Sequence, residues 1–174
     1  SDCPFWTNET LFQMKTLPKH LLIIGGGVIA CELGQAFAML GAKVTIIVRS
    51  SLLSGRDENA ISLIRQQFSE MGITVYENAD IQSVTSLEAR KVIIIQQAQK
   101  EQIITGTQVL VATGRTADLS VLNGNKAGVE QENGYIKVDK RLRTSNKNIY
   151  AIGDVIGQAQ FTHMANHHAS VLVK

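Results

Sequence analysis

The chain has 174 residues, of which 44% are hydrophobic, enough for one ordinary globular domain or for one domain and part of a second. Its net charge of +2 comes from 17 basic and 15 acidic residues without a basic run, which argues against a nucleic-acid-binding protein. The two cysteines, Cys3 and Cys31, form no CxxC or metal-ligand pattern. Neither a disulfide framework nor a zinc site is therefore expected, and a cytoplasmic protein is favoured. The most apolar stretch, residues 21–28, contains three glycines and is soon followed by Glu32, so it is too short and too polar to span a bilayer.

Strand and helix patterns alternate along the first half of the chain. After a lead-in segment over residues 1–17, apolar runs and helical spacing predict a strand at 21–24, a helix at 28–40, a strand at 44–48, a helix at 57–71 and a strand at 73–76. The first strand is apolar throughout, which is typical of a central parallel strand buried on both faces. The alternation predicts a right-handed, Rossmann-like parallel core.

The pattern changes after this core. Short β-like runs with too little sequence between them for helices predict a three-stranded antiparallel meander at 81–87, 91–97 and 102–105. An apolar strand at 109–112 follows, and the chain from 118 to 133 is rich in loops. Brief strands are expected at 135–138 and 149–152, and a helix at 164–174. The expected fold class is α/β, with a parallel-sheet domain over residues 18–116 that carries the inserted meander and a partial second segment over 117–174.

A glycine-rich turn lies between the first predicted strand and the first predicted helix. Gly25-Gly26-Gly27-Val28-Ile29-Ala30 fits G-x-G-x-x-A in the context that a dinucleotide-binding turn requires. Gly25 would permit the tight turn, Gly27 would let a pyrophosphate approach the backbone, and Ala30 would let helix and strand pack closely. The helix N-terminus would offer N–H groups and partial positive charge to the phosphates. The alternative is a tight turn without a ligand, which the strand–turn–helix–strand context disfavours.

The end of the second predicted strand indicates which nicotinamide cofactor is bound. NAD sites place an acidic residue there to bind the ribose 2′-hydroxyl. Here the strand ends at Val48 and Arg49 follows, with Arg56 a little further along. Arginine can pair with a 2′-phosphate, which a carboxylate would repel. The sequence therefore favours NADP over NAD, the alternative being that both arginines are solvated loop residues.

At this point the sequence resembles the pyridine nucleotide–disulfide oxidoreductases, a family that includes glutathione reductase, dihydrolipoamide dehydrogenase and mercuric reductase. Four strings carry the resemblance and span nearly the whole chain: G-G-G-V-I-A-C-E-L from Gly25, V-L-V-A-T-G-R from Val109, Thr144 with I-Y-A-I-G-D from Ile149, and Q-F-T-H from Gln160. Within the family, residues 42–46, Arg49-Ser50 and Gln160-Phe161 are most similar to mercuric reductase.

The resemblance implies roles for several residues. Glu32 matches a helix residue near the nicotinamide that helps to hold the ring for hydride transfer. Ala112, Thr113 and Gly114 match the strand end that passes close to the cofactor. The other matches fall in a partial FAD-binding segment over residues 117–174. Gly153 and Asp154 match the turn whose carboxylate binds a ribityl hydroxyl, and Phe161, Thr162 and His163 match the start of a helix that faces the flavin.

A histidine cluster suggests an alternative function. His163 and His167 are one helical turn apart, as in a metal-binding pair, and His168 follows. No carboxylate or cysteine completes a ligand set nearby in the sequence. The cluster is therefore interpreted as ordinary surface or interface histidines, and no metal is expected.

The resemblance also implies segments that this sequence lacks. Family members carry an N-terminal flavin-binding glycine motif, a C-x-x-x-x-C redox pair and a C-terminal dimerisation domain. The chain is therefore interpreted as part of a longer, homodimeric flavoenzyme that passes a hydride from NAD(P)H to FAD and then electrons to a dithiol or a metal ion such as Hg(II). By itself it is expected to be inactive and to bind FAD weakly. The alternatives are an NAD(P)H oxidase or ferredoxin-reductase-like flavoenzyme, or a non-catalytic nucleotide-binding redox module.

Overall fold

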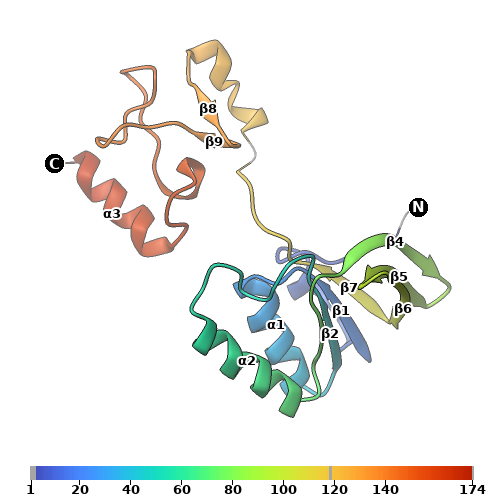
Figure 1. Ribbon diagram of the computed structural model, residues 1–174. Helices are drawn as coiled ribbons and strands as arrows, with labels where there is room; N and C mark the ends of the chain where they lie inside the picture. The colour runs from blue at the N-terminus through green and yellow to red at the C-terminus, as the bar shows by residue number, and fades with distance from the viewer. Residues whose placement is uncertain (1–2, 118, 174) are drawn as a thin grey trace. The chain divides into compact units, whose positions relative to one another are not determined.

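The computed structural model describes residues 3–117 and 119–173. The chain forms two compact units, one that ends at Gly114 and one that begins at Arg115 (Figure 1). Three predicted features extend to residues outside the described ranges: the first two positions of the lead-in segment, the first position of the loop-rich stretch, and the last position of the C-terminal helix. Among the described residues, no helix is both long enough and apolar enough to cross a membrane.

The first unit is built on a four-stranded parallel sheet in the order β3-β2-β1-β7. Its strands are β1 (His20–Ile24), β2 (Lys43–Ile47), β3 (Thr74–Tyr76) and β7 (Gln108–Val111). In the register of the sheet, Ile24 pairs with Ile47 on one side and with Val111 on the other. The carboxyl ends of the three strands therefore meet at one edge, and the predicted parallel core is confirmed.

Opposite faces of this sheet pack against different elements. Helices α1 (Val28–Met39) and α2 (Glu58–Glu70) lie on one side, as Figure 1 shows. Their apolar side chains share a core with Leu21, Ile23 and Ile46, all 0% exposed. The other face packs on the meander through Leu22 and Val109. Burial on both faces explains why the strand sequences are continuous apolar runs.

The predicted antiparallel meander is present, with strands in the order β4-β5-β6. Its members are β4 (Asp80–Leu87), β5 (Arg90–Gln97) and β6 (Lys100–Gly106). The last strand begins two residues before the predicted position because Ala98 and Gln99 both adopt left-handed conformations, with φ of 47° and 63°, and form a tight turn without glycine. Gly106 packs so closely on the sheet that a Cβ there would lie 2.5 Å from Leu22 Cγ.

The lead-in segment is part of the first unit. The Trp6 N–H donates to Val109 O and Trp6 O accepts from the Val111 N–H, both at 2.8 Å, so Trp6 forms a parallel bridge with Leu110 at the edge of β7. A short 3₁₀ helix (Leu11–Gln13) follows, and Leu11 is completely buried in the core.

The second unit contains little regular structure. It comprises short 3₁₀ helices (Ser120–Leu122, Gly124–Ala127 and Gly153–Ile156), the hairpin of β8 (Gln131–Glu132) and β9 (Tyr135–Ile136), and the helix α3 (Thr162–Val173). The predicted strand at 149–152 was wrong. Within the described residues, this run pairs only through an isolated bridge between Tyr150 and Arg143, and Ala151 packs into a small core with Leu142 and Ile156. β9 is also shorter than predicted, and α3 begins two residues earlier.

Replacing Gly25 should destabilise the first unit. Its φ is 127°, and a Cβ at this position would lie 2.3 Å from Ala112 O. Gly25→Ala should therefore lower the free energy of unfolding by about 3 kcal/mol, through both backbone strain and a clash with backbone. Gly41→Ala is the matched control, since Gly41 has a φ of 96° but no atom within 4 Å of the point where a Cβ would lie. Urea unfolding of both variants measures the difference, and equal losses would contradict the close packing of Gly25.

The two cysteines should differ in reactivity. Cys31 is 8% exposed, and its burial, with a smaller effect of the neighbouring Glu32 charge, raises the pKa of its thiol to about 11. Cys3 is partly exposed. Because the thiolate is the reactive species, iodoacetamide at neutral pH should label Cys3 alone in the native chain and both cysteines in denaturant. Mass spectrometry of the labelled peptides measures this, and fast native labelling of Cys31 would contradict its burial.

Candidate functional site

The glycine turn is held between two strand ends. The Gly25 N–H donates to Ile47 O at 2.9 Å, and Ala112 N–H donates to Ile24 O at 2.8 Å. A Cβ on Gly25 would collide with the Ala112 carbonyl, which allows only glycine at this point. The structure therefore brings the predicted glycine turn into contact with the start of the predicted Ala112-Thr113-Gly114 segment.

The next two glycines have different surroundings. A Cβ on Gly26 would lie 2.4 Å from Val48 Cγ1, so Gly26 packs against the end of β2. Gly27 has no atom within 4 Å of its Cβ position, which lies in open space, and the residue is exposed. Ala30 is 0% exposed and lies in the core between helix and sheet, as its small size predicted. Of the three glycines, Gly27 is therefore the one with room for a ligand among the described residues.

Helix α1 begins directly after Gly27. Its N-cap is Gly27, which supplies no side-chain hydrogen bond, and its first turn carries no acidic residue. Val28 is 49% exposed and Ile29 is partly buried. The first N–H groups of a helix have no partners within the helix and carry partial positive charge, so this end can accept an anion. Glu32 lies one turn further along and is exposed.

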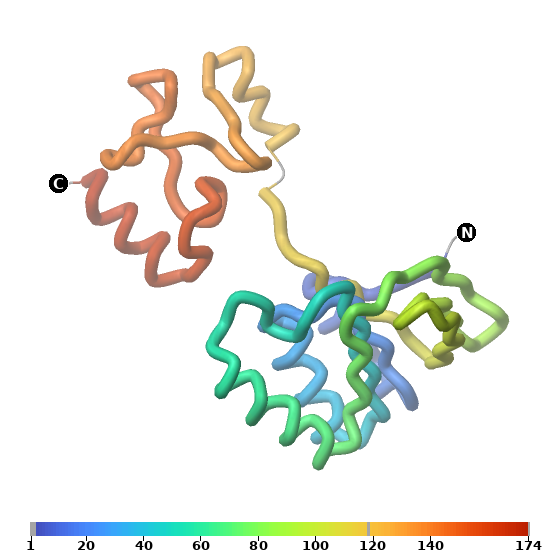
Figure 2. The backbone as a smooth tube through the Cα atoms, viewed as in Figure 1, coloured from blue at the N-terminus to red at the C-terminus, as the bar shows by residue number. Residues whose placement is uncertain are grey.

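Arg49 and Arg56 lie on the loop between β2 and α2, which can be followed in Figure 2. Both side chains are exposed, and neither forms an ion pair with any of the residues that the structure describes. The loop is attached to the glycine turn, because the Leu53 N–H donates to Gly26 O at 2.7 Å. Two unpaired cations thus extend from a segment bonded directly to the turn.

Glu77, which the sequence analysis did not single out, holds the middle of the same loop. Its Oε1 accepts from the Leu52 N–H at 2.5 Å and from Arg65 Nη2 at 3.0 Å, and its Oε2 accepts from Arg65 Nε at 3.2 Å. Arg65 also donates to Glu58, at the start of α2. Burial opposes the charge on Glu77, but the hydrogen bonds from Arg65 and Leu52 outweigh it and lower the pKa of the carboxyl.

The position of Glu77 in the sequence could have indicated its role. It comes directly after β3, and β3 is the parallel neighbour of β2, with Ile47 paired to Tyr76. The residues that follow parallel strands share the edge where ligands bind in open α/β sheets. A carboxylate after the third strand was therefore as notable as the missing carboxylate after the second.

The remaining predicted site residues belong to the second unit. Gly153 has a φ of 74° and begins a 3₁₀ turn whose first side chain, Asp154, pairs with Arg115 at 3.0 Å. The Gly153 N–H donates to Nδ1 of His168, 3.2 Å away. At the start of α3, the rings of Phe161 and His163 stack with centroids 5.3 Å apart, and Thr162 is exposed.

His168 is not one of the surface or interface histidines that the sequence predicted. It is 5% exposed, and a ring nitrogen that accepts a hydrogen bond must be unprotonated. His168 therefore fixes the backbone of the Gly153-Asp154 turn from within α3. Among residues 3–117 and 119–173, no group of three or more histidine, cysteine or acidic side chains is arranged to hold a metal ion.

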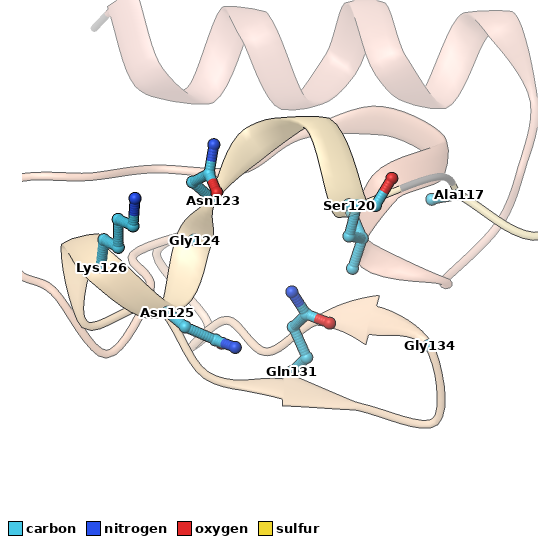
Figure 3. Close-up of a pocket in the computed structure, with 9 residues that line it drawn as sticks. Ala117, Ser120, Asn123, Gly124, Asn125, Lys126, Gln131 and Gly134 are labelled. Carbon is cyan, nitrogen blue, oxygen red and sulfur yellow. The ribbon is translucent and has the colours of Figure 1, made fainter.

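A hollow of about 550 Å³ lies in the second unit, between the short 3₁₀ helices and the β8–β9 hairpin (Figure 3). Gln131 points into it, whereas Lys126 points away. None of the predicted site residues lines this hollow, and its lining is neutral apart from Lys126: Ala117, Leu119, Ser120, Asn123, Gly124, Asn125, Gln131 and Gly134. A lining with one lysine and otherwise neutral residues does not indicate a particular ligand.

Comparisons with known proteins agree on one family. Residues 3–169 match the sequence family described as pyridine nucleotide-disulphide oxidoreductase. Mycothione reductase of Mycobacterium tuberculosis is 31% identical over 172 residues, which are 99% of this chain and 37% of that protein. Mercuric reductase of Streptomyces lividans is 34% identical over 169 residues, 97% of this chain and 36% of that protein.

Solved structures show the same relationship. The HOCl-induced flavoprotein disulfide reductase of Escherichia coli superposes with a TM-score of 0.88 at 31% identity, over 95% of this chain and 38% of that one. LpdA of Mycobacterium tuberculosis gives a TM-score of 0.86 at 27% identity, over 95% and 36% of the two chains. This chain thus spans less than two fifths of the length of these relatives. The predicted α/β fold is confirmed, and a match over nearly the whole sequence shows that the chain belongs to the pyridine nucleotide-disulphide oxidoreductase family.

Proposed function

We propose that the unit ending at Gly114 binds a nicotinamide dinucleotide, with the pyrophosphate over the amino end of α1. The observation that carries this proposal is the contrast within the glycine turn. Gly25 and Gly26 are crowded by Ala112 and Val48, whereas the Cβ position of Gly27 lies in open space beside an uncapped helix end. A turn that served only to reverse the chain would not need a third glycine on its open side.

We propose further that NADPH is preferred to NADH. The ribose of the adenosine half would lie at the end of β2, where Val48 stands instead of an acidic residue. Arg49 and Arg56 would bind the 2′-phosphate through charge-assisted hydrogen bonds. Both guanidinium groups are exposed and free of intramolecular ion pairs within the described part of the chain, so binding would not require them to leave another partner.

Other residues of this unit would position the nicotinamide. Ala112, Thr113 and Gly114 follow β7 beside the glycine turn, and their small size allows the cofactor to approach the backbone. Glu32, exposed one turn into α1, would hold the ring in the arrangement needed for hydride transfer. The bound nicotinamide supplies the hydride, and the protein contributes orientation.

The second unit would contribute part of a flavin site. Asp154 is 41% exposed and already paired with Arg115, so one carboxylate oxygen is available to a ribityl hydroxyl. The start of α3, with Phe161, Thr162 and His163, would face the flavin ring. The donor set therefore fits FAD in part, which is consistent with weak FAD binding and no turnover by this chain alone. In a cytoplasmic, homodimeric parent, electrons would pass from NADPH through FAD to a dithiol or a metal ion such as Hg(II).

A titration with the two cofactors tests the nucleotide preference. Isothermal titration of the 174-residue chain should show tighter binding of NADPH than of NADH. Arg49→Glu should weaken NADPH binding by at least about tenfold and remove the preference, because a carboxylate repels the 2′-phosphate. Arg90→Glu, the same charge change on the exposed start of β5, should leave both affinities unchanged. Equal affinity of the native chain for both cofactors would refute the NADP preference.

Replacing Gly27 with a bulky residue should weaken cofactor binding while changing the stability of the fold very little. Gly27 has ordinary backbone angles, with φ of −81°, and free space around its Cβ position. Gly27→Val should therefore cost less than about 1 kcal/mol of stability. Gly27→Val should weaken the binding of NADPH by at least about tenfold, because the valine methyl groups would occupy the space assigned to the pyrophosphate. Urea unfolding and calorimetric titration of one preparation give both quantities, and unchanged affinity would exclude the proposed position.

A further inference from the structure

Two consecutive amides in the β2–α2 loop bond to different parts of the first unit. The Leu53 N–H donates to Gly26 O in the glycine turn, and the Leu52 N–H donates to the Glu77 carboxylate after β3. Leu53 has a φ of 49°, a left-handed conformation that a leucine keeps only when its surroundings impose it. Glu77 is thus one of the contacts that impose the course of the loop between Arg49 and Arg56.

The beginning of the loop is held independently of Glu77. The Asn78 N–H donates to Ser50 O at 2.7 Å, and the Ala79 N–H donates to Val48 O at 3.0 Å. These contacts do not involve a carboxylate. Loss of Glu77 would therefore free the middle of the loop without detaching the loop from the sheet.

Arg65 compensates the negative charge of Glu77. Ile47 is paired with Tyr76 in the register of the sheet, so Glu77 follows β3 opposite Val48, the residue directly before Arg49. An uncompensated carboxylate there would repel a phosphate bound by the loop. Arg65 binds both oxygens of Glu77, which neutralises its charge while Oε1 still accepts from Leu52.

We propose that Glu77, neutralised by Arg65, is a positioning residue for the 2′-phosphate of NADPH. By holding Leu52 it fixes the loop from which Arg49 and Arg56 reach that phosphate. The inference rests on the proposed NADPH preference and adds a residue that does not touch the cofactor. It implies that specificity depends on the order of the loop as well as on its charge.

Whether removal of Glu77 weakens or tightens NADPH binding distinguishes a positioning role from a purely electrostatic one. Removing a negative charge near a phosphate site should tighten phosphate binding if charge alone matters. Loss of a positioning contact should weaken it. We expect Glu77→Ala to weaken the binding of NADPH by about tenfold and the binding of NADH by less than about twofold. Glu77→Gln keeps an oxygen for the Leu52 N–H and should restore part of the loss.

Glu58→Ala is the matched control. It removes a carboxylate of the same charge from the same arginine, but Glu58 is 75% exposed, and among the described residues its carboxylate accepts hydrogen bonds from Arg65 and from no backbone N–H of the loop. Its effect on both cofactors should stay within about twofold. Adenosine 2′,5′-bisphosphate and 5′-AMP differ only in the 2′-phosphate. Glu77→Ala should therefore weaken the binding of the bisphosphate but not that of 5′-AMP, and Glu58→Ala should affect neither.

Limited trypsin digestion reports on the loop without a cofactor. Glu77→Ala should speed cleavage after Arg49 and Arg56 selectively, whereas Glu58→Ala should not. Three results would overturn the role of Glu77: an unchanged NADPH to NADH ratio in Glu77→Ala, an equal loss for both cofactors, or faster cleavage along the whole chain with a lower Tm. Equal affinities in the native chain would instead refute the NADPH preference itself, and this inference with it.

Discussion

The approach of Gly25 to the Ala112 carbonyl is the contact on which the site depends. It forces the chain that leaves β1 to turn at the edge where β2 and β7 also end, and it aims the start of α1 across that edge. A side chain at Gly25 would separate β7 from the turn, and one at Gly26 would push β2 away through Val48. Tight packing on two sides leaves one free side, and that side exposes the backbone of Gly27.

Electrostatic features follow from this geometry. The uncapped end of α1 offers partial positive charge to an anion, and the β2–α2 loop, which follows the neighbouring strand, adds Arg49 and Arg56. The acidic side chain at the same edge, Glu77, is paired with Arg65. Within the part of the chain that the structure describes, this region therefore carries two arginines without ion pairs and a carboxylate whose charge Arg65 compensates.

Sequence patterns predicted the first unit well because its strands are buried on both faces. Such strands are continuous apolar runs, and a short run such as residues 21–24 has few other interpretations. The patterns predicted β6 and the strand at 149–152 less well. The Ala98–Gln99 turn contains no glycine to mark it, and the apolar residues near Ala151 pack into a small core and form only a single bridge, between Tyr150 and Arg143, among the described residues. Glu77 and His168 were missed as parts of the site because each acts on a backbone N–H distant in sequence, 25 and 15 residues away. Such contacts depend on the tertiary fold and leave no local periodicity.

The pairing of Trp6 with β7 has a practical consequence. Trp6 is the sole tryptophan of the chain, and the strand beside it leads within two residues to the carbonyl that meets Gly25. Tryptophan emission overlaps the absorption band of a reduced nicotinamide, so resonance energy transfer would quench Trp6 when such a ring is bound nearby. For the proposed nicotinamide ligand, Trp6 would thus be a built-in optical reporter, and occupancy could be followed in real time without a label.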